Sequence, residues 1–239
     1  MSMVILTVNK IIQLLKENNK YRIAFVGDSL TSCEWVHPNW REIVEYVLKN
    51  ELESKFEDWK VPSWGIRCFN FGFDGSTTRD ILEKSEEILE IKPDLIICLM
   101  GGNDPTLGIK AEESKSNINN LMEKFKGKDV FWMANLPELI EEKNMEYEEY
   151  RKATMEVLCN DNQKIFDSFD EYKKYDLNKI FTLVTSEYLG QNYKKDPTHP
   201  NQLGNAYIAK IVLKEIFEIE FDPEKFIETT LNGEKYPKY

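Results

Sequence analysis

The chain has 239 residues, of which 41% are apolar and 12% aromatic, which is enough to build a buried core and argues against disorder. Its formal net charge of −11 argues against nucleic acid, anionic membranes or polyanionic substrates as partners. The length fits one α/β unit. We therefore expect a single domain over 1–239, with its core at about 22–218 and a C-terminal tail at 221–239.

The N-terminal twenty residues lack a basic leader, and their apolar positions are spaced as on one face of a helix. No apolar run reaches transmembrane length. The four cysteines are widely separated, with no CxxC pair and no Cys/His cluster, so we expect no structural zinc site. A reducing cytoplasm is the default location, and the sequence indicates no oligomeric state.

Five short apolar segments rich in β-forming residues recur along the chain, at 22–26, 66–70, 95–100, 130–134 and 164–168. Several are nearly continuous apolar runs, as is typical of strands covered on both faces. Stretches with helical spacing accompany them, at 40–56, 77–91, 113–125, 138–160 and 201–218. This alternation predicts a three-layer α/β/α sandwich around a parallel sheet of about five strands. The tail 221–239 shows no clear pattern.

Two loops that follow the first and second predicted strands carry residues suited to acyl transfer. In such a sheet, the chemistry belongs at the carboxyl ends of the strands. GDSLT at 27–31 places Ser29 there, as a nucleophile or as an ordinary helix N-cap. NFGFDGSTT at 70–78 supplies Gly72 and Gly75, which are either turn glycines or backbone N–H donors open to a substrate oxygen.

Two later loops complete the set. GGND at 101–104 offers Asn103, a capping residue or a side-chain donor to an oxyanion. DPTHPN holds Asp196 and His199, one of only two histidines, as an ordinary turn or as a base with its orienting acid. Acyl transfer by serine needs a hydroxyl, an imidazole, a carboxylate and oxyanion donors. Together, the four loops therefore favour a serine esterase more strongly than any one of them does.

With GDSL, NFGFDGSTT, GGND and DPTHP in this order, the chain resembles the SGNH/GDSL hydrolases over about 22–215. The resemblance implies a flavodoxin-like fold and the hydrolysis of an ester or thioester through an acyl-enzyme, without a cofactor or metal. It implies that Ser29 is the nucleophile, His199 the general base and Asp196 the partner that orients it. The expected partner is a small-molecule ester, and neither nucleic acid nor membrane insertion is expected.

The same resemblance implies an oxyanion hole made of the Ser29 N–H, the Gly75 N–H and the Asn103 side chain. Gly75 is preferred to Gly72 because it lies five residues after Asn70, as the glycine of the family usually does after its asparagine.

Other functions and residues compete with this interpretation. A metal-dependent phosphoesterase could use the acids of GGND and DPTHP, but two-metal sites generally need several histidines. A non-catalytic binding module is not indicated, because every triad and oxyanion position is filled. A thioesterase or lysophospholipase-type acylhydrolase would use the same residues. Asp28 and Asp104 could bind metal, although acids in turns are usually structural.

The second histidine, His37, lies eight residues after Ser29, and we expect no acid placed to orient it. Trp35 and Trp40 beside it either line a pocket, where they could stack on a sugar, or pack their loop onto the protein body. Tyr188 and Tyr193 could border the same pocket. The two tryptophans tilt the expectation toward a small ester such as an acetylated sugar.

Overall fold

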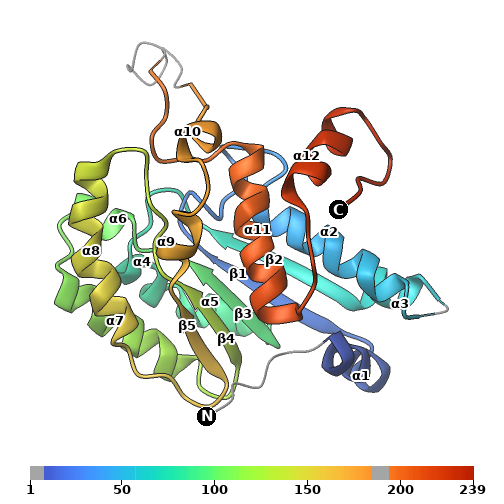
Figure 1. Cartoon of the computed structure of the whole chain (residues 1–239). Coiled ribbons are helices and arrows are strands. Elements are labelled where there is room, and N and C mark those ends of the chain that lie inside the picture. Colours follow the sequence, from blue (N-terminus) through green and yellow to red (C-terminus); the bar gives the residue numbers. More distant parts are fainter. Residues whose placement is uncertain (1–7, 57, 185–193) are drawn as a thin grey trace.

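One sheet of five parallel strands forms the centre of the protein, in the order β2-β1-β3-β4-β5 (Figure 1). The structure is a computed structural model, and it describes residues 8–56, 58–184 and 194–239. The strands are β1 (Tyr21–Gly27), β2 (Ile66–Gly72), β3 (Leu95–Leu99), β4 (Asp129–Met133) and β5 (Gln163–Phe166). This strand order is that of a flavodoxin-like doubly wound sheet, and it places the topological switch point between β1 and β3.

Successive residues of the central strands enter two different cores. On β1, Ile23 and Phe25 belong to the core on one face, whereas Ala24 and Val26 belong to the core on the other, and all four are 0% exposed. A strand buried on both faces must be apolar at every position. This burial explains why the strands appear in the sequence as continuous apolar runs rather than alternating ones.

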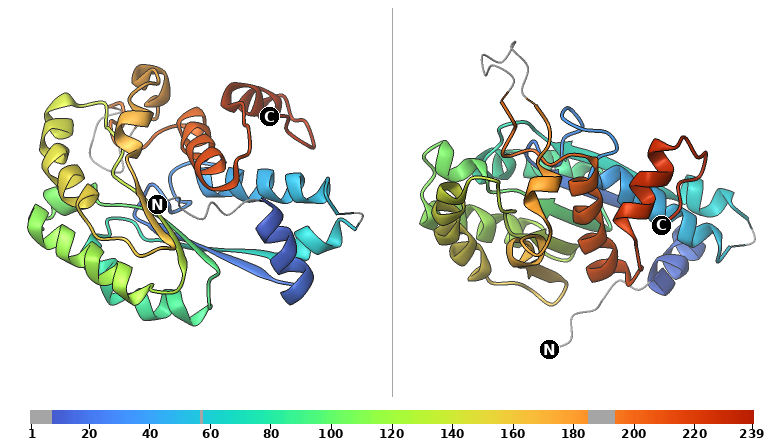
Figure 2. Two further views of the ribbon diagram at one scale, coloured as in Figure 1. Left: turned by 60° about the horizontal axis from the view of Figure 1, so that its bottom comes forward. Right: turned by 45° about the horizontal axis from the view of Figure 1, so that its top comes forward.

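Helices cover both faces of the sheet, which confirms the predicted three-layer α/β/α architecture (Figure 2). One face carries α1 (Val8–Asn18), α2 (Trp40–Glu53), α3 (Lys60–Gly65), α9 (Ser168–Tyr172), α10 (Leu177–Ile180), α11 (Gln202–Phe217) and α12 (Pro223–Leu231). The other carries α4 (Thr78–Glu83), α5 (Ser85–Glu90) and α7 (Ala111–Lys124), with α6 (Asn103–Thr106) and α8 (Glu141–Met155) packed beside α7. Within the described ranges, no helix is long and apolar enough to cross a membrane.

Two helical predictions need correction, and one further helix was not predicted. The stretch 77–91 is two short helices, α4 and α5, joined at Lys84, whose ψ is 0°. The stretch 138–160 is helical only in α8, because Asn144 binds both backbone polar groups of Glu138 and holds that residue in the preceding loop. The tail 221–239 contains a regular helix, α12, which Asp222 caps and Pro223 begins.

Candidate active site

The loop between β1 and α2 holds Ser29 at the carboxyl end of β1. Its start is a tight turn, in which the backbone N–H groups of Thr31 and Ser32 both donate to the Asp28 carbonyl at 3.0 Å. The Asp28 side chain accepts from the Leu30 N–H at 3.0 Å. Ser29 is therefore presented at the edge of the sheet, at the switch point where such folds gather their ligands.

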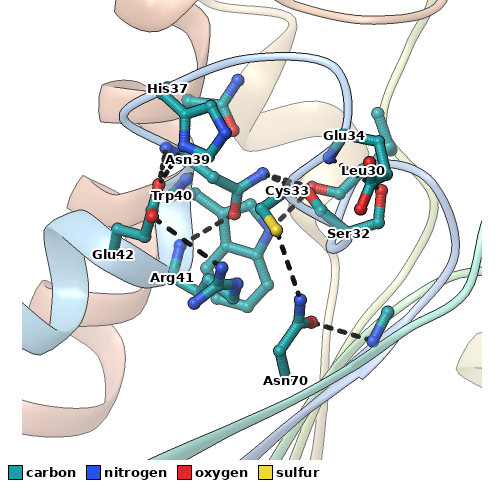
Figure 3. Close-up of polar contacts among 12 residues, drawn as sticks. Leu30, Ser32, Cys33, Glu34, His37, Asn39, Trp40, Arg41, Glu42 and Asn70 are labelled. Carbon is teal, nitrogen blue, oxygen red and sulfur yellow. Dashed lines mark hydrogen bonds and ion pairs between the residues drawn. The ribbon is translucent and has the colours of Figure 1, made fainter.

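Asn39 braces the far half of this loop (Figure 3). Its Nδ2 donates to the carbonyls of Leu30 at 3.2 Å and Ser32 at 3.0 Å, both within the turn that starts at Asp28. Its Oδ1 accepts from Arg41 N at 3.2 Å and so caps α2. One buried amide thus ties the loop that carries Ser29 to the start of the helix.

Ser29, His199 and Asp196 form one chain of hydrogen-bonded side chains. His199 Nε2 lies 2.9 Å from Ser29 Oγ, and His199 Nδ1 lies 2.8 Å from Asp196 Oδ2. The other carboxylate oxygen, Asp196 Oδ1, accepts from the backbone N–H groups of Thr198 at 2.8 Å and His199 at 3.0 Å. Burial acts to raise the pKa of Asp196, but the hydrogen bonds from His199 and the loop backbone outweigh it and hold that pKa below its usual value. Asp196 is therefore a buried, ionised carboxylate aimed at the imidazole.

Trp35 covers one face of the imidazole. Its ring is stacked on His199 with centroids 3.8 Å apart and planes 6° from parallel. The indole N–H donates to Asp74 Oδ2 at 3.1 Å, and Asp74 Oδ1 accepts from Ser32 Oγ at 2.5 Å. These contacts fix the histidine ring in orientation, a role for Trp35 beyond the two that the sequence suggested.

Trp40 is the first residue of α2 and His37 lies three residues before it, and both contact neighbouring parts of the protein. Trp40 is fully buried against Phe25, so of the two alternatives for it, packing the loop is correct. An acid does lie beside His37, contrary to expectation, because Glu42 Oε2 is 3.2 Å from His37 Nδ1. This pair sits at the start of α2, and the His37 side chain is 65% exposed.

Gly75 and Asn103 lie on two neighbouring loops, which one hydrogen bond from Asn103 joins. Gly75 is the third residue of a turn closed by Ser76 N–H donating to the Phe73 carbonyl at 3.0 Å, and its φ of +72° suits glycine there. Asn103 Nδ2 donates to the Ser76 carbonyl at 3.0 Å, which uses one of its two N–H groups. Asn103 lines the same cavity as Ser29, whereas Gly75 is not among the residues that line it.

Gly72 has a different setting from Gly75. A Cβ at Gly72 would lie 2.3 Å from Ser32 N, whereas nothing lies within 4 Å of a Cβ built at Gly75. Gly72 is thus needed for the close approach of two loops, and the space beside Gly75 is open.

The acids next to these motifs are held in structural roles. Asp104 is fully buried and accepts from both the backbone N–H and the hydroxyl of Thr78, at 2.8 and 2.6 Å. Burial raises the pKa of Asp28 to about 6. In the part of the chain that the structure describes, no cluster of three or more metal-ligating side chains occurs.

A cavity of about 250 Å³ opens beside Ser29 and contains polar residues that the sequence reasoning missed. Asn135 and Glu138 come from the loop after β4, and Tyr147 comes from α8. The signal available was position, because ANLPE directly follows a predicted strand at the same edge of the sheet. Tyr188 and Tyr193, which could also border this region, lie outside the described residues.

Comparisons with known proteins point to one family. A sequence model of the GDSL-like Lipase/Acylhydrolase family matches residues 25–207. An acetylxylan esterase from Geobacillus stearothermophilus is 30% identical over 99 residues, which are 38% of this chain and 42% of that esterase. The match thus spans less than half the length of that relative.

Solved structures share the fold at low sequence identity. The lipase/acylhydrolase from Enterococcus faecalis has a TM-score of 0.63 at 19% identity, covering 82% of this chain and 95% of that one. Axe2, an acetylxylan esterase from Geobacillus stearothermophilus, has a TM-score of 0.62 at 20% identity, covering 85% of this chain and 95% of that one.

Proposed function

The chain belongs to the GDSL-like lipase/acylhydrolase family and is a hydrolase of ester bonds, and we propose that it cleaves a carboxylic ester with a Ser29–His199–Asp196 triad. The observation that carries this proposal is the continuous hydrogen-bonded chain from Ser29 Oγ through both ring nitrogens of His199 to Asp196. This arrangement is the one that serine acyl transfer requires, with a hydroxyl, a base and a carboxylate that orients the base.

The reaction proceeds in two halves. His199 Nε2 takes the proton of Ser29 Oγ as that oxygen attacks the ester carbonyl, and the imidazolium then protonates the leaving alcohol. In the second half, a water molecule is deprotonated by His199 and attacks the acyl-enzyme, which releases the acid and restores Ser29. Asp196 accepts a hydrogen bond from the His199 Nδ1–H throughout and stabilises the imidazolium.

The negative charge that develops on the carbonyl oxygen needs hydrogen-bond donors. We assign this role to the backbone N–H groups of Ser29 and Gly75 and to the Nδ2 of Asn103, which keeps one N–H after its bond to Ser76. Loss of one such donor is expected to cost roughly 10²–10³ in turnover.

The substrate we propose is an ester with a small acyl group, such as an O-acetylated sugar. The likeness to an acetylxylan esterase supports this choice. The cavity beside Ser29, of about 250 Å³, favours a small ester as a whole, because it lies below the usual range of roughly 300–1,000 Å³ for pockets that take drug-sized ligands.

Replacement of the nucleophile tests the proposal. Ser29→Ala is expected to lower kcat on p-nitrophenyl acetate by at least about 10⁴, and a serine-directed phosphonate should label the wild-type protein at Ser29 only. Activity that survives in Ser29→Ala would refute the triad. Loss of activity with a chelator, together with an unlabelled Ser29, would point instead to a metal-dependent phosphoesterase.

A further inference from the structure

We propose that the cavity beside Ser29 binds the alcohol part of the ester, and that Asn135, Glu138 and Tyr147 select an alcohol carrying free hydroxyl groups, as a sugar does. The inference depends on the proposed esterase function of Ser29. It adds a specificity to that function which the triad alone does not provide, because the triad treats all esters alike.

The polar part of the cavity is rigidly built. Tyr147 is 2% exposed and Glu138 is 8% exposed, and the Tyr147 hydroxyl donates to Glu138 Oε1. The backbone of Glu138 is clamped by Asn144, whose side chain accepts from the Glu138 N–H at 2.8 Å and donates to the Glu138 carbonyl at 2.9 Å. The carboxylate is therefore held in place on the wall of the cavity before any substrate arrives.

Asn135 presents an unused donor in the same wall. This residue is 4% exposed, and its Nδ2 has no hydrogen-bond partner among the described residues. A buried donor without a partner is costly to the folded protein, so such a group calls for an acceptor from outside the protein or for another explanation. Because Asn135 also lines the cavity, we assign that acceptor to a substrate oxygen.

A hydroxyl group matches this combination of partners. Asn135 Nδ2 can only donate. The Glu138 carboxylate accepts from Tyr147 and also has a hydrogen bond with Thr198, but its two oxygens have room for further donors, and Tyr147 Oη can accept while it donates to Glu138. A hydroxyl both accepts and donates, so neighbouring hydroxyls of a sugar ring can satisfy all three groups. A plain alkyl or aryl alcohol would leave them unpaired, which is the basis of strong discrimination.

The position of the histidine places the alcohol, rather than the acyl group, on this side. The leaving oxygen has to lie within hydrogen-bond reach of His199 Nε2 to receive its proton. Thr198 and Pro200, on either side of His199, both line the cavity, together with Ser29 and Asn103. The cavity therefore extends from the nucleophile along the histidine loop, where the leaving oxygen has to lie.

Charge also favours the alcohol part over the acid product as the occupant of the cavity. Asp28 lines the cavity together with Glu138, and its pKa of about 6 leaves it mostly ionised at pH 8. A carboxylate product would be repelled by Asp28, whereas a neutral, hydroxyl-rich alcohol would not.

Two substrates with the same acyl group provide the test. They are a monoacetylated methyl β-xyloside, whose alcohol carries hydroxyls, and p-nitrophenyl acetate, whose alcohol does not. Tyr147→Phe and Asn135→Ala are each expected to lower the ratio of kcat/KM for the xyloside ester over p-nitrophenyl acetate by about tenfold. The matched control is Tyr150→Phe, also on α8, whose hydroxyl donates to the Ile109 carbonyl at 2.6 Å and does not line the cavity. This control should leave the ratio unchanged.

Equal losses on both substrates would show that Tyr147 and Asn135 act only on folding or on the triad, and an unchanged ratio would show that they do not contact the alcohol. Either result overturns the proposal.

A binding measurement separates failure of this proposal from failure of the esterase function. Methyl β-xyloside should raise the Tm of Ser29→Ala, and it should do so less in the double variant that also carries Tyr147→Phe. Acetate should cause no such shift. If acetate binds there and the xyloside does not, the cavity takes the acyl side and the proposal is wrong, even where Ser29→Ala has proved inactive as the esterase function requires.

Discussion

His199 is held at both ring nitrogens and on one ring face, by Asp196, Ser29 and Trp35. The first of these contacts can be tested in isolation, because asparagine at position 196 can still accept from the backbone N–H groups of Thr198 and His199 at Oδ1. Its amide nitrogen, which would replace Oδ2, cannot accept a hydrogen bond from the His199 Nδ1–H. Asp196→Asn is therefore expected to lower kcat by about 10⁴ through the wrong tautomer of His199, with little change in Tm. A loss below tenfold in ester hydrolysis would contradict the role of Asp196.

Asp28 makes the stability of the protein depend on pH. Burial raises its pKa from 3.8 to about 6 in the folded state, so between these values the folded state binds more protons than the unfolded state. The contribution of this group to stability is thus fully present below about pH 3.8 and is lost as pH rises through 6, by up to about 3 kcal/mol.

Asp28→Asn removes this ionisation and keeps an acceptor for the Leu30 N–H. The variant is expected to have a higher free energy of unfolding than the wild type at pH 8, with the difference vanishing near pH 4. Urea unfolding at the two pH values measures it. Asp161→Asn, on an exposed turn, is the control and should show no such difference. A gain of the same size at both pH values would mean that the ionisation of Asp28 is not the cause.

The residues of the proposed triad could be predicted from the sequence because Ser29 stands directly after a strand, histidine occurs only twice, and Asp196 lies three residues before His199. The surroundings of the triad could not be predicted. The stacking of Trp35 on His199 joins two loops that are distant in sequence, and Asn135, Glu138 and Tyr147 meet only through packing of α8 beside the β4 loop. No local pattern encodes such contacts.

At the scale of elements, strand positions were predicted to within about two residues, because burial on both faces leaves an unbroken apolar run. The break between α4 and α5 was not, since Ile81 and Ile88 are seven residues apart and face one core from both helices. A period of seven fits a continuous helix equally well. At the bend at Lys84, Ser85 Oγ donates to the Leu82 carbonyl at 2.7 Å. The bend does not change the seven-residue spacing of the buried isoleucines, so this spacing could not predict it.

Helix α11 approaches the histidine loop so closely that only glycine fits at position 204. A Cβ there would lie 2.4 Å from Ile180 Cγ2 and 2.5 Å from Pro200 Cβ. Alanine normally stabilises a helix interior relative to glycine, but here Gly204→Ala is expected to lower the free energy of unfolding by about 1–3 kcal/mol.

The same variant should lower kcat, because the displaced Pro200 is bonded to His199. Thermal unfolding and ester hydrolysis measure the two effects. Lys214→Ala, at an exposed position of the same helix, is the control for a change in helix propensity alone. If Gly204→Ala proves more stable than the wild type, the packing described for α11 is wrong.

At the scale of the whole molecule, α12 extends the core on one face of the sheet. Phe226 is 4% exposed and packs against Tyr46 and Phe221, with ring centroids at 5.9 and 5.4 Å. Phe226→Ala should therefore cost about 3–5 kcal/mol of unfolding free energy. Leu231→Ala on the same helix, where the side chain is 73% exposed, should cost less than about 0.5 kcal/mol. Chemical denaturation compares them, and similar small losses would mean that the tail only lies on the surface.

Ser29 and His199, the proposed nucleophile and base, lie 170 positions apart in the chain, yet their side chains share one hydrogen bond. During synthesis, Ser29 leaves the ribosome early and stays without His199 until the segment around position 199 has emerged and α11 has docked. On the proposed mechanism, a nascent or truncated chain is therefore expected to be inert toward esters even when β1 to β4 have already assembled. The appearance of hydrolytic activity in a cell-free translation reaction would thus report, in real time, that the segment around position 199 and α11 have packed onto the rest of the protein.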